Sequence, residues 1–295
     1  MKRILFYFFL LRKVVLLNIY PLFEHKGRFC RLMRLDIENF LIFQPSRLRA
    51  KRINRDLLKK IKPQRFLNKD NIKLYAWYIP PTKSKKIILH FHGQAESILT
   101  HQDVAKFCLD KGIGLYMLSY RGHYKSGGSA SEKGVYRDAQ SAIEQLKQKG
   151  FREQDIILWG HSLGTAVALE TAKHNKISGV ILQCPIKNLK SAAIDICNFY
   201  YRRIHLILLT TLVKYRIKRL RLISKLDNIA KIKEVNCPIL LLHSKSDCIA
   251  PFTNSIELAS LNSNSHLYIS DTGSHWDVKW CLNKVFEFVS TLEYN

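Results

Sequence analysis

The chain has 295 residues, enough for one large domain with a well-buried core, or for one domain with an appendage. Apolar residues make up 47% and aromatic residues 11%, which excludes an intrinsically disordered chain. The net charge of +25 could reflect a nucleic-acid partner, an anionic membrane surface or a general surface bias. The two most basic stretches, 1–65 and 202–233, are also rich in Leu, Ile, Phe and Tyr, a combination that favours a membrane surface over nucleic acid.

The N-terminal segment 4–23 is long and apolar enough to cross a bilayer. Arg12 and Lys13 interrupt it, and each would cost about 2.5–3.5 kcal/mol at the centre of a membrane helix. A cleaved signal peptide is disfavoured, because the apolar run before Arg12 is short and no small-x-small cleavage site follows. Three interpretations stay open: a membrane anchor, a helix lying in the membrane interface, or a helix packed on the domain. We therefore predict a basic, apolar extension over 1–65 and a membrane-associated protein. The dense Lys and Arg after residue 25 would keep the remaining chain on the cytoplasmic side.

The seven cysteines are odd in number and include no Cys-x-x-Cys pair. This pattern argues against a disulfide framework and a zinc site, and favours a reducing compartment. Cys184 and Cys237 adjoin apolar runs, which is typical of core residues.

From about residue 71, strand-like and helix-like segments alternate, which predicts an α/β fold with a doubly wound, mostly parallel sheet over 66–295. The expected strands are several short apolar runs, at 72–79, 86–92, 114–119, 155–160, 178–183, 238–243 and 265–270. The expected helices are 131–150, 163–174, 254–261 and 277–292. An insertion at about 188–225 has a helical pattern and is predicted to form a lid between two core strands.

The sequence Gly-His-Ser-Leu-Gly at 160–164 matches the G-x-S-x-G motif, directly after a predicted strand and before an alanine-rich helical run. In that setting the flanking glycines permit a sharp turn, and the hydroxyl of Ser162 is exposed above the sheet at the start of the next helix. Ser162 is therefore the predicted nucleophile. The alternative is a glycine-rich turn in which Ser162 only caps the helix.

A serine nucleophile needs a base, and the base needs an acid that orients it; in this fold the chain order is Ser, acid, His. Downstream, Asp247 follows one predicted strand and His275 follows the next. Because the carboxyl ends of parallel strands share one edge of the sheet, both side chains are expected to converge on Ser162. Asp271 is a rival acid, but it is close in sequence to His275.

Acyl transfer also needs hydrogen-bond donors for the developing oxyanion. The backbone N–H of Leu163 is the first expected donor, and the backbone N–H of Gln94, after Gly93, is the second. His92, in the same loop, is interpreted as a structural hydrogen-bonding residue rather than a second base.

Four segments carry a family resemblance. The run HFHGQAES at 90–97 resembles the HGNAxN oxyanion loop of one branch of the α/β-hydrolases, 120–128 is similar to its YRGYGxSxG segment, and 131–134 to its SExG segment. The segment 43–46 also resembles the residues after the anchor of that branch. The branch includes membrane-tethered serine hydrolases, among them protein depalmitoylases, lysophospholipases and esterases similar to monoacylglycerol lipase.

The resemblance implies an eight-stranded sheet and a triad of Ser162, Asp247 and His275. Two departures stand out: Gln94 replaces the usual Asn, and the acid loop has Ser244 where relatives usually have Gly. Arg121 is expected to hold its loop by hydrogen bonds to backbone or to an acid.

We therefore predict a serine hydrolase that cleaves carboxylic esters or thioesters through an acyl-enzyme. The expected substrates are acyl lipids or acylated proteins, with an anionic membrane surface as a partner; no metal, cofactor or nucleic acid is implied. Two alternatives remain: a serine peptidase of the same fold, which would need an acidic site for the amino terminus of a substrate, and a catalytically silent, membrane-binding relative. A nucleic-acid-binding module is disfavoured, because no recognition motif occurs.

Overall fold

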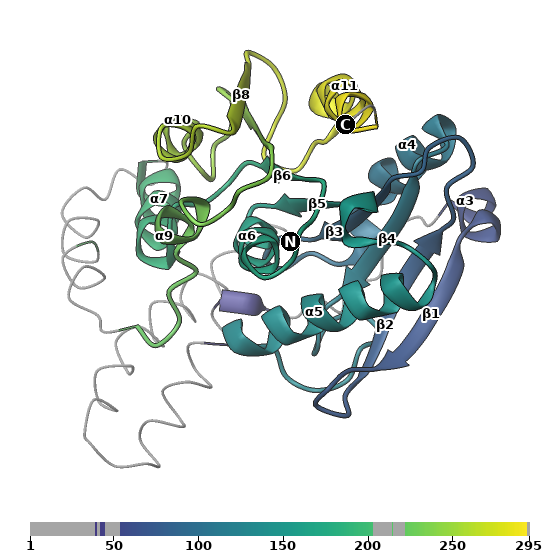
Figure 1. Ribbon diagram of the computed structural model, residues 1–295. Coiled ribbons are helices and arrows are strands. Elements are labelled where there is room, and N and C mark those ends of the chain that lie inside the picture. Colours follow the sequence, from purple (N-terminus) through teal and green to yellow (C-terminus); the bar gives the residue numbers. More distant parts are fainter. Residues whose placement is uncertain (1–38, 40–41, 45–53, 203–213, 215–221, 294–295) are drawn as a thin grey trace, which may run out of the picture.

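A computed structural model describes residues 39, 42–44, 54–202, 214 and 222–293 (Figure 1). Its eight strands form one sheet: β1 (Lys62–Leu67), β2 (Lys73–Ile79), β3 (Ile87–Phe91), β4 (Gly114–Ser119), β5 (Ile156–His161), β6 (Gly179–Gln183), β7 (Ile239–Ser244) and β8 (Ser265–Ser270). The described α-helices are α3 (Arg55–Lys60), α4 (Gln102–Lys111), α5 (Glu132–Gln148), α6 (Gly164–Lys173), α7 (Leu189–Arg202), α9 (Asn228–Ile232), α10 (Thr253–Ala259) and α11 (Leu282–Thr291). Short 3-10 turns are η2 (Ile98–Thr100), η3 (Glu153–Asp155) and η4 (Lys279–Cys281).

The strand order is β1-β2-β4-β3-β5-β6-β7-β8. β2 runs antiparallel to β1 and β4, whereas the pairs from β4 through to β8 are parallel. This topology confirms the predicted α/β-hydrolase fold, and each of the seven expected strands is observed to within one residue at either end. The carboxyl ends of β3 to β8 consequently share one edge of the sheet, where ligand sites of open α/β sheets form.

The eighth strand that the resemblance implies is β1, whose position in the sequence was not predicted. It begins at Lys62, before the predicted domain boundary at residue 66, so the sheet reaches into the segment assigned to the N-terminal extension. An edge strand tolerates Pro63, which has no N–H to donate, and its mostly exposed side chains lack a strong apolar pattern. Helix α4 was also not predicted; it ends at Gly112, whose φ of 71° forms a left-handed cap.

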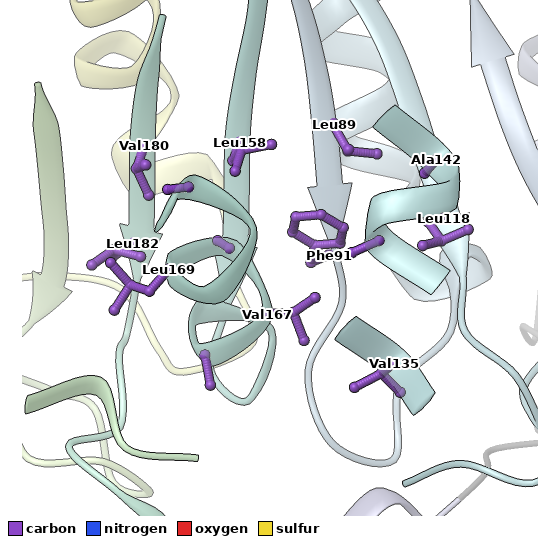
Figure 2. Packing of buried hydrophobic residues seen from close by; sticks show 14 of the residues in the cluster. Leu89, Phe91, Leu118, Val135, Ala142, Leu158, Val167, Leu169, Val180 and Leu182 are labelled. Atoms are coloured by element: carbon purple, nitrogen blue, oxygen red, sulfur yellow. The ribbon is translucent and has the colours of Figure 1, made fainter. Parts of the chain in front are cut away.

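Each face of the sheet has its own apolar core, because successive strand residues point to opposite sides. On one face Phe91 and Leu158 pack with α5 and α6, as Figure 2 shows for Val135 and Val167. On the other face Trp159 packs with residues of α3, α4 and α11. Truncating one of these fully buried aromatic side chains to Ala would cost about 3–5 kcal/mol, so the two cores hold the edge of the sheet in a fixed shape.

The predicted lid is only partly described. Helix α7 lies between β6 and β7 in the chain, as expected for an insertion at 188–225, while residues 203–213 and 215–221 lie outside the described residues. The predicted N-terminal segment 4–23 lies outside them as well. Within the described ranges, no helix combines the length and apolar character that a bilayer span requires.

Candidate active site

The turn between β5 and α6 presents Ser162 in a strained backbone conformation. Its φ is 52°, in the left-handed region that residues with a side chain rarely adopt. A side chain at Gly160 would lie 2.4 Å from the carbonyl oxygen of Gly164, and one at Gly164 would lie 2.2 Å from that of Phe91. Both glycines are therefore required for the strand and helix to approach this closely, and the tight turn places Ser162 at the edge of the sheet.

The structure brings the three predicted residues together. The Nε2 atom of His275 lies 3.1 Å from Oγ of Ser162, and its Nδ1 atom lies 2.7 Å from Oδ2 of Asp247. A carboxylate beside Nδ1 fixes the tautomer in which Nδ1 donates, and Nε2 is left to accept the Ser162 hydroxyl proton. This is the geometry in which a serine hydroxyl can transfer its proton to an imidazole.

Hydrogen bonds to the main chain hold the Asp247 side chain so that Oδ2 faces His275. Its Oδ1 atom accepts the N–H groups of Ile249 and Ala250 at 2.8 and 2.9 Å. Its Oδ2 atom faces His275 and, at 3.2 Å, Nε2 of His243. Burial by itself would raise the pKa of Asp247, but the hydrogen bonds from His243 and His275 more than offset it and hold the pKa well below its usual range. Asp247 is therefore ionised at neutral pH.

His275 is buried, and burial lowers its pKa below the ordinary value for histidine, although the hydrogen bond to Asp247 opposes the shift. The neutral form, the one able to accept a proton, is thus favoured around neutral pH. The neighbouring Trp276 is 62% exposed, and its ring lies edge-on to His275 with centroids 5.6 Å apart.

The rival acid, Asp271, points elsewhere. It is largely exposed and forms an ion pair with Lys245 at 2.7 Å. Ser244, which stands where relatives usually have Gly, makes two hydrogen bonds through its hydroxyl. The hydroxyl donates to the carbonyl of Gly273 at 3.1 Å and accepts the N–H of Ser246 at 3.0 Å. Ser244 therefore ties the loop of Asp247 to the loop of His275, a link that Gly could not make.

The predicted oxyanion loop follows β3. The N–H of Gly93 donates to Oε2 of Glu96 at 2.6 Å, which closes a tight turn around Gln94. On the other side of the site, Leu163 immediately precedes α6, so its N–H belongs to the first turn of that helix. Gln94 and Leu163 thus lie on the two segments, after β3 and after β5, from which oxyanion donors are expected.

Sequence reasoning missed a second set of residues in contact with the site. Oε2 of Glu96 lies 2.9 Å from Nδ1 of His161 and 2.9 Å from Nε2 of His101, and Nε2 of His161 lies 2.7 Å from the carbonyl oxygen of His275. One nitrogen or oxygen atom of each of Glu96, His101 and His161 could bind a metal ion, and these atoms lie within 4.8 Å of one another. The hydrogen bonds described above already account for this spacing. A histidine next to the nucleophile and a glutamate three residues after Gly93 were the available signals.

Other interpretations can also be compared with the structure. Arg121 holds its loop as expected, through Asp138 at 2.8 Å and Asp70 at 2.7 Å. His92 is buried, and its Nδ1 contacts the carbonyl of Gly93 at 3.0 Å, in keeping with a structural role. Cys184 is buried as expected, but it also lies beside the site, with its sulfur within 4.8 Å of ligand atoms of His243 and Asp247.

The family described as serine aminopeptidase, S33 matches residues 82–233, which are 152 of the 295 residues and include Ser162. Among curated proteins, the chain is similar to the uncharacterized protein YfhR of Escherichia coli O157:H7, with 27% identity over 224 residues that cover 72% of each protein. It is also similar to the lysophosphatidylserine lipase ABHD12 of Macaca fascicularis, with 27% identity over 197 residues that cover 63% of this chain and 48% of that protein.

Solved structures show the same architecture. An esterase of Pyrococcus furiosus superimposes with a TM-score of 0.67 at 20% identity, covering 85% of this chain and 97% of that one. An α/β hydrolase of Vibrio vulnificus superimposes with a TM-score of 0.67 at 20% identity, covering 90% of this chain and 95% of that one. At this identity the likeness shows the α/β-hydrolase fold alone, and the membrane-tethered branch stays a prediction. The family match over more than half of the chain shows that this protein belongs to the α/β-hydrolase family described as serine aminopeptidase, S33.

Proposed function

We propose that the protein is a serine hydrolase that cleaves carboxylic esters or thioesters through an acyl-enzyme, with Ser162 as nucleophile, His275 as base and Asp247 as orienting acid. The observation that carries the proposal is the continuous chain of contacts from Ser162 Oγ to His275 Nε2 at 3.1 Å and from His275 Nδ1 to Asp247 at 2.7 Å. The strained backbone of Ser162 supports it, because such strain is characteristic of a nucleophile on a sharp strand-to-helix turn.

The reaction follows from this geometry. Ser162 Oγ attacks the acyl carbon as its proton passes to His275 Nε2, and the backbone N–H groups of Leu163 and Gln94 hold the resulting oxyanion. The bond to the leaving alkoxide or thiolate then breaks, and His275 gives that group its proton. Water, deprotonated by His275, attacks the ester on Ser162; the acid is released and the Ser162 hydroxyl regains a proton. Asp247 remains ionised throughout and stabilises the charged imidazole.

Acyl chains presented at a membrane are the substrates we propose. Three observations support them: the exposed Trp276 beside His275, the half-buried apolar side chains of α7 between β6 and β7, and the basic, apolar stretches of the sequence. An exposed tryptophan and basic side chains suit the interface of an anionic membrane. The similarity to a protein named as a lysophosphatidylserine lipase points to the same substrate class. Membrane association on the cytoplasmic side is part of this proposal.

Labelling with a fluorophosphonate probe tests the nucleophile. Wild-type protein is expected to label and Ser162→Ala is not, whereas equal labelling of both would overturn the assignment of the site. Absence of labelling in folded wild-type protein would favour the catalytically silent alternative.

A series of p-nitrophenyl esters then tests the substrate class. Because each buried methylene contributes about 0.8 kcal/mol, kcat/KM should rise with chain length beyond about eight carbons. Turnover of short esters only would contradict an acyl-lipid substrate.

One observation favours a second candidate, a serine aminopeptidase. Asp195, on α7, is half-buried; burial raises its pKa, while a hydrogen bond from Asn254 at 3.3 Å opposes the shift. A carboxylate on this segment is the kind of group that binds the amino terminus of a peptide. The experiment compares aminoacyl p-nitroanilides with p-nitrophenyl esters on wild-type protein and Asp195→Asn. Peptidase activity predicts anilide hydrolysis that the substitution abolishes; ester hydrolysis unchanged by the substitution supports the esterase.

A further inference from the structure

Glu96 is a buried carboxylate with three hydrogen-bonding partners on a single oxygen. Its Oε2 atom accepts the N–H of Gly93 at 2.6 Å and lies 2.9 Å from a ring nitrogen of His101 and 2.9 Å from one of His161. Gly93 begins the proposed oxyanion loop, and His161 directly precedes Ser162. A side chain at Gly93 would lie 2.7 Å from Glu96 Oε2 and 3.1 Å from Nδ1 of His161, so the loop is packed tightly against this pair.

His161 continues the network to the base. Its Nε2 atom lies 2.7 Å from the carbonyl oxygen of His275, and its ring centroid lies 5.0 Å from the ring of His275. A carbonyl oxygen can only accept, so Nε2 of His161 must carry a proton. Nδ1 faces an oxygen of Glu96, and an ionised carboxylate has no proton to give, so Nδ1 also donates. With both nitrogens protonated, His161 is an imidazolium paired with the Glu96 carboxylate.

The electrostatics of the two groups agree with this arrangement. Burial alone would raise the pKa of Glu96, but its electrostatic interactions and hydrogen bonds with His161 and His101 more than offset it and lower the pKa well below its usual value. Burial alone would lower the pKa of His161, but the charge and hydrogen bond of Glu96, together with the carbonyl of His275 and the charge of Asp247, more than offset it and raise the pKa. Each member of the pair therefore stabilises the charged form of the other.

We propose that the Glu96–His161 ion pair is a positioning unit for the hydrolysis proposed above, on which this inference rests. The pair joins the oxyanion loop, the residue before the nucleophile and the main chain of His275 through three hydrogen bonds. It thereby links the loop that carries Gln94, the proposed oxyanion donor, to the main chain of the base His275. Neither Glu96 nor His161 exchanges a proton with the substrate.

The positive charge on His161 has a second effect. It disfavours protonation of His275, and this effect is larger than the opposite effect of the Glu96 charge. The other titratable groups around His161 include His101, His90, Asp247 and the Cys184 thiol, and His275 additionally faces Asp247 and Ser162. Loss of the ion pair should therefore raise the pKa of His275, so that the base is lost at higher pH than in the wild type.

The kinetic experiment uses Glu96→Gln, which keeps the shape and removes the charge. We expect kcat for a p-nitrophenyl ester to fall about 10- to 100-fold, as displacement of aligned groups does, with KM changed less than about twofold. The acid limb of the kcat/KM profile should move to higher pH, a change that a purely structural defect would not cause. Glu96→Asp, which keeps the charge, should retain the wild-type acid limb. The matched control is His174→Gln. It removes an exposed histidine–carboxylate pair on the surface of α6, in which Nε2 of His174 lies 3.2 Å from Glu170.

Wild-type protein provides a second readout that does not depend on the folding of a variant. In ¹⁵N-histidine NMR, His161 should show two protonated ring nitrogens at pH 8, assigned by their absence in His161→Gln. A neutral His161 at that pH, or a Glu96→Gln enzyme with wild-type kcat and acid limb, would overturn the inference. The Ser162→Ala variant distinguishes failure of the proposed function from failure of this inference. Activity that survives the substitution contradicts the proposed function, whereas the NMR result tests only the Glu96–His161 ion pair.

Discussion

Two buried carboxylates lie near the same edge of the sheet, and their partners differ. Asp138, on α5, faces the guanidinium of Arg121 and accepts its backbone N–H, and Asn68 donates to it at 2.7 Å. Asp247, after β7, faces the imidazoles of His243 and His275. Arginine stays protonated at every physiological pH, whereas histidine changes its charge near neutrality. The Asp138 cluster can therefore only hold the fold, while the Asp247 cluster can move protons; burial of an acid does not by itself identify a catalytic group.

The largest expected contrast comes from removing the charge of Asp247. Asp247→Asn should keep the fold but lower kcat by about 10⁴-fold, because the amide favours the wrong tautomer of His275 and cannot stabilise its charged form. Steady-state kinetics with a p-nitrophenyl ester, normalised to folded protein by circular dichroism, provide the measurement. A decrease below tenfold in a folded variant would remove Asp247 from the site.

Arg121→Met should lower stability and leave activity unchanged, the reverse of the effect expected for Asp247→Asn. It leaves Asp138 without its buried cation, so the free energy of unfolding should fall by about 3–5 kcal/mol, while kcat/KM per folded molecule stays unchanged. The matched control is Arg152→Met, which removes a similar two-point pairing with Asp155 from an arginine whose side chain is 69% exposed; it should lower the free energy of unfolding far less, because solvent screens the exposed pair. Equal losses in the two variants, measured by urea unfolding, would contradict the distinction between buried and exposed pairs.

The pH dependence sharpens the same comparison. Burial lowers the pKa of His275, and the residue must be neutral to accept a proton from Ser162. Activity is therefore present above the pKa of His275 and is lost as the pH falls through it. Since that pKa lies below the ordinary value of about 6.5, the acid limb of kcat/KM should have its midpoint below pH 6.5. A midpoint above that value would show that the environment of His275 favours its charged form.

The smallest effect concerns the strain at Ser162. Ser162→Gly and Ser162→Ala should both be inactive, but only glycine relieves the left-handed backbone conformation at φ 52°. The glycine variant should therefore be more stable than the alanine variant by about 1 kcal/mol in urea unfolding, after allowance for its greater unfolded-state entropy. An alanine variant at least as stable as glycine would mean that the turn stores no strain.

Chain order and strand ends were sufficient to bring Ser162, Asp247 and His275 together, because parallel strands place their carboxyl ends at one edge whatever the loop details. The Glu96–His161 pair could not be predicted in this way, because Glu96 does not follow a strand end directly and meets His161 only where its loop turns back at Gly93. The position of strand β1 was also missed, because its side chains are mostly exposed and show no clear apolar pattern. The strand is defined by its antiparallel pairing with β2, which the sequence does not reveal.

Trapping the acyl-enzyme tests the central claim most directly. The wild-type protein is mixed with a long-chain p-nitrophenyl ester, quenched in acid during turnover, digested and analysed by mass spectrometry. The account predicts an added acyl mass on the peptide that contains Ser162, lost in Ser162→Ala and absent once the substrate is exhausted. Turnover at the same rate in Ser162→Ala, or an acyl group on another residue that forms and decays at the turnover rate, would contradict it.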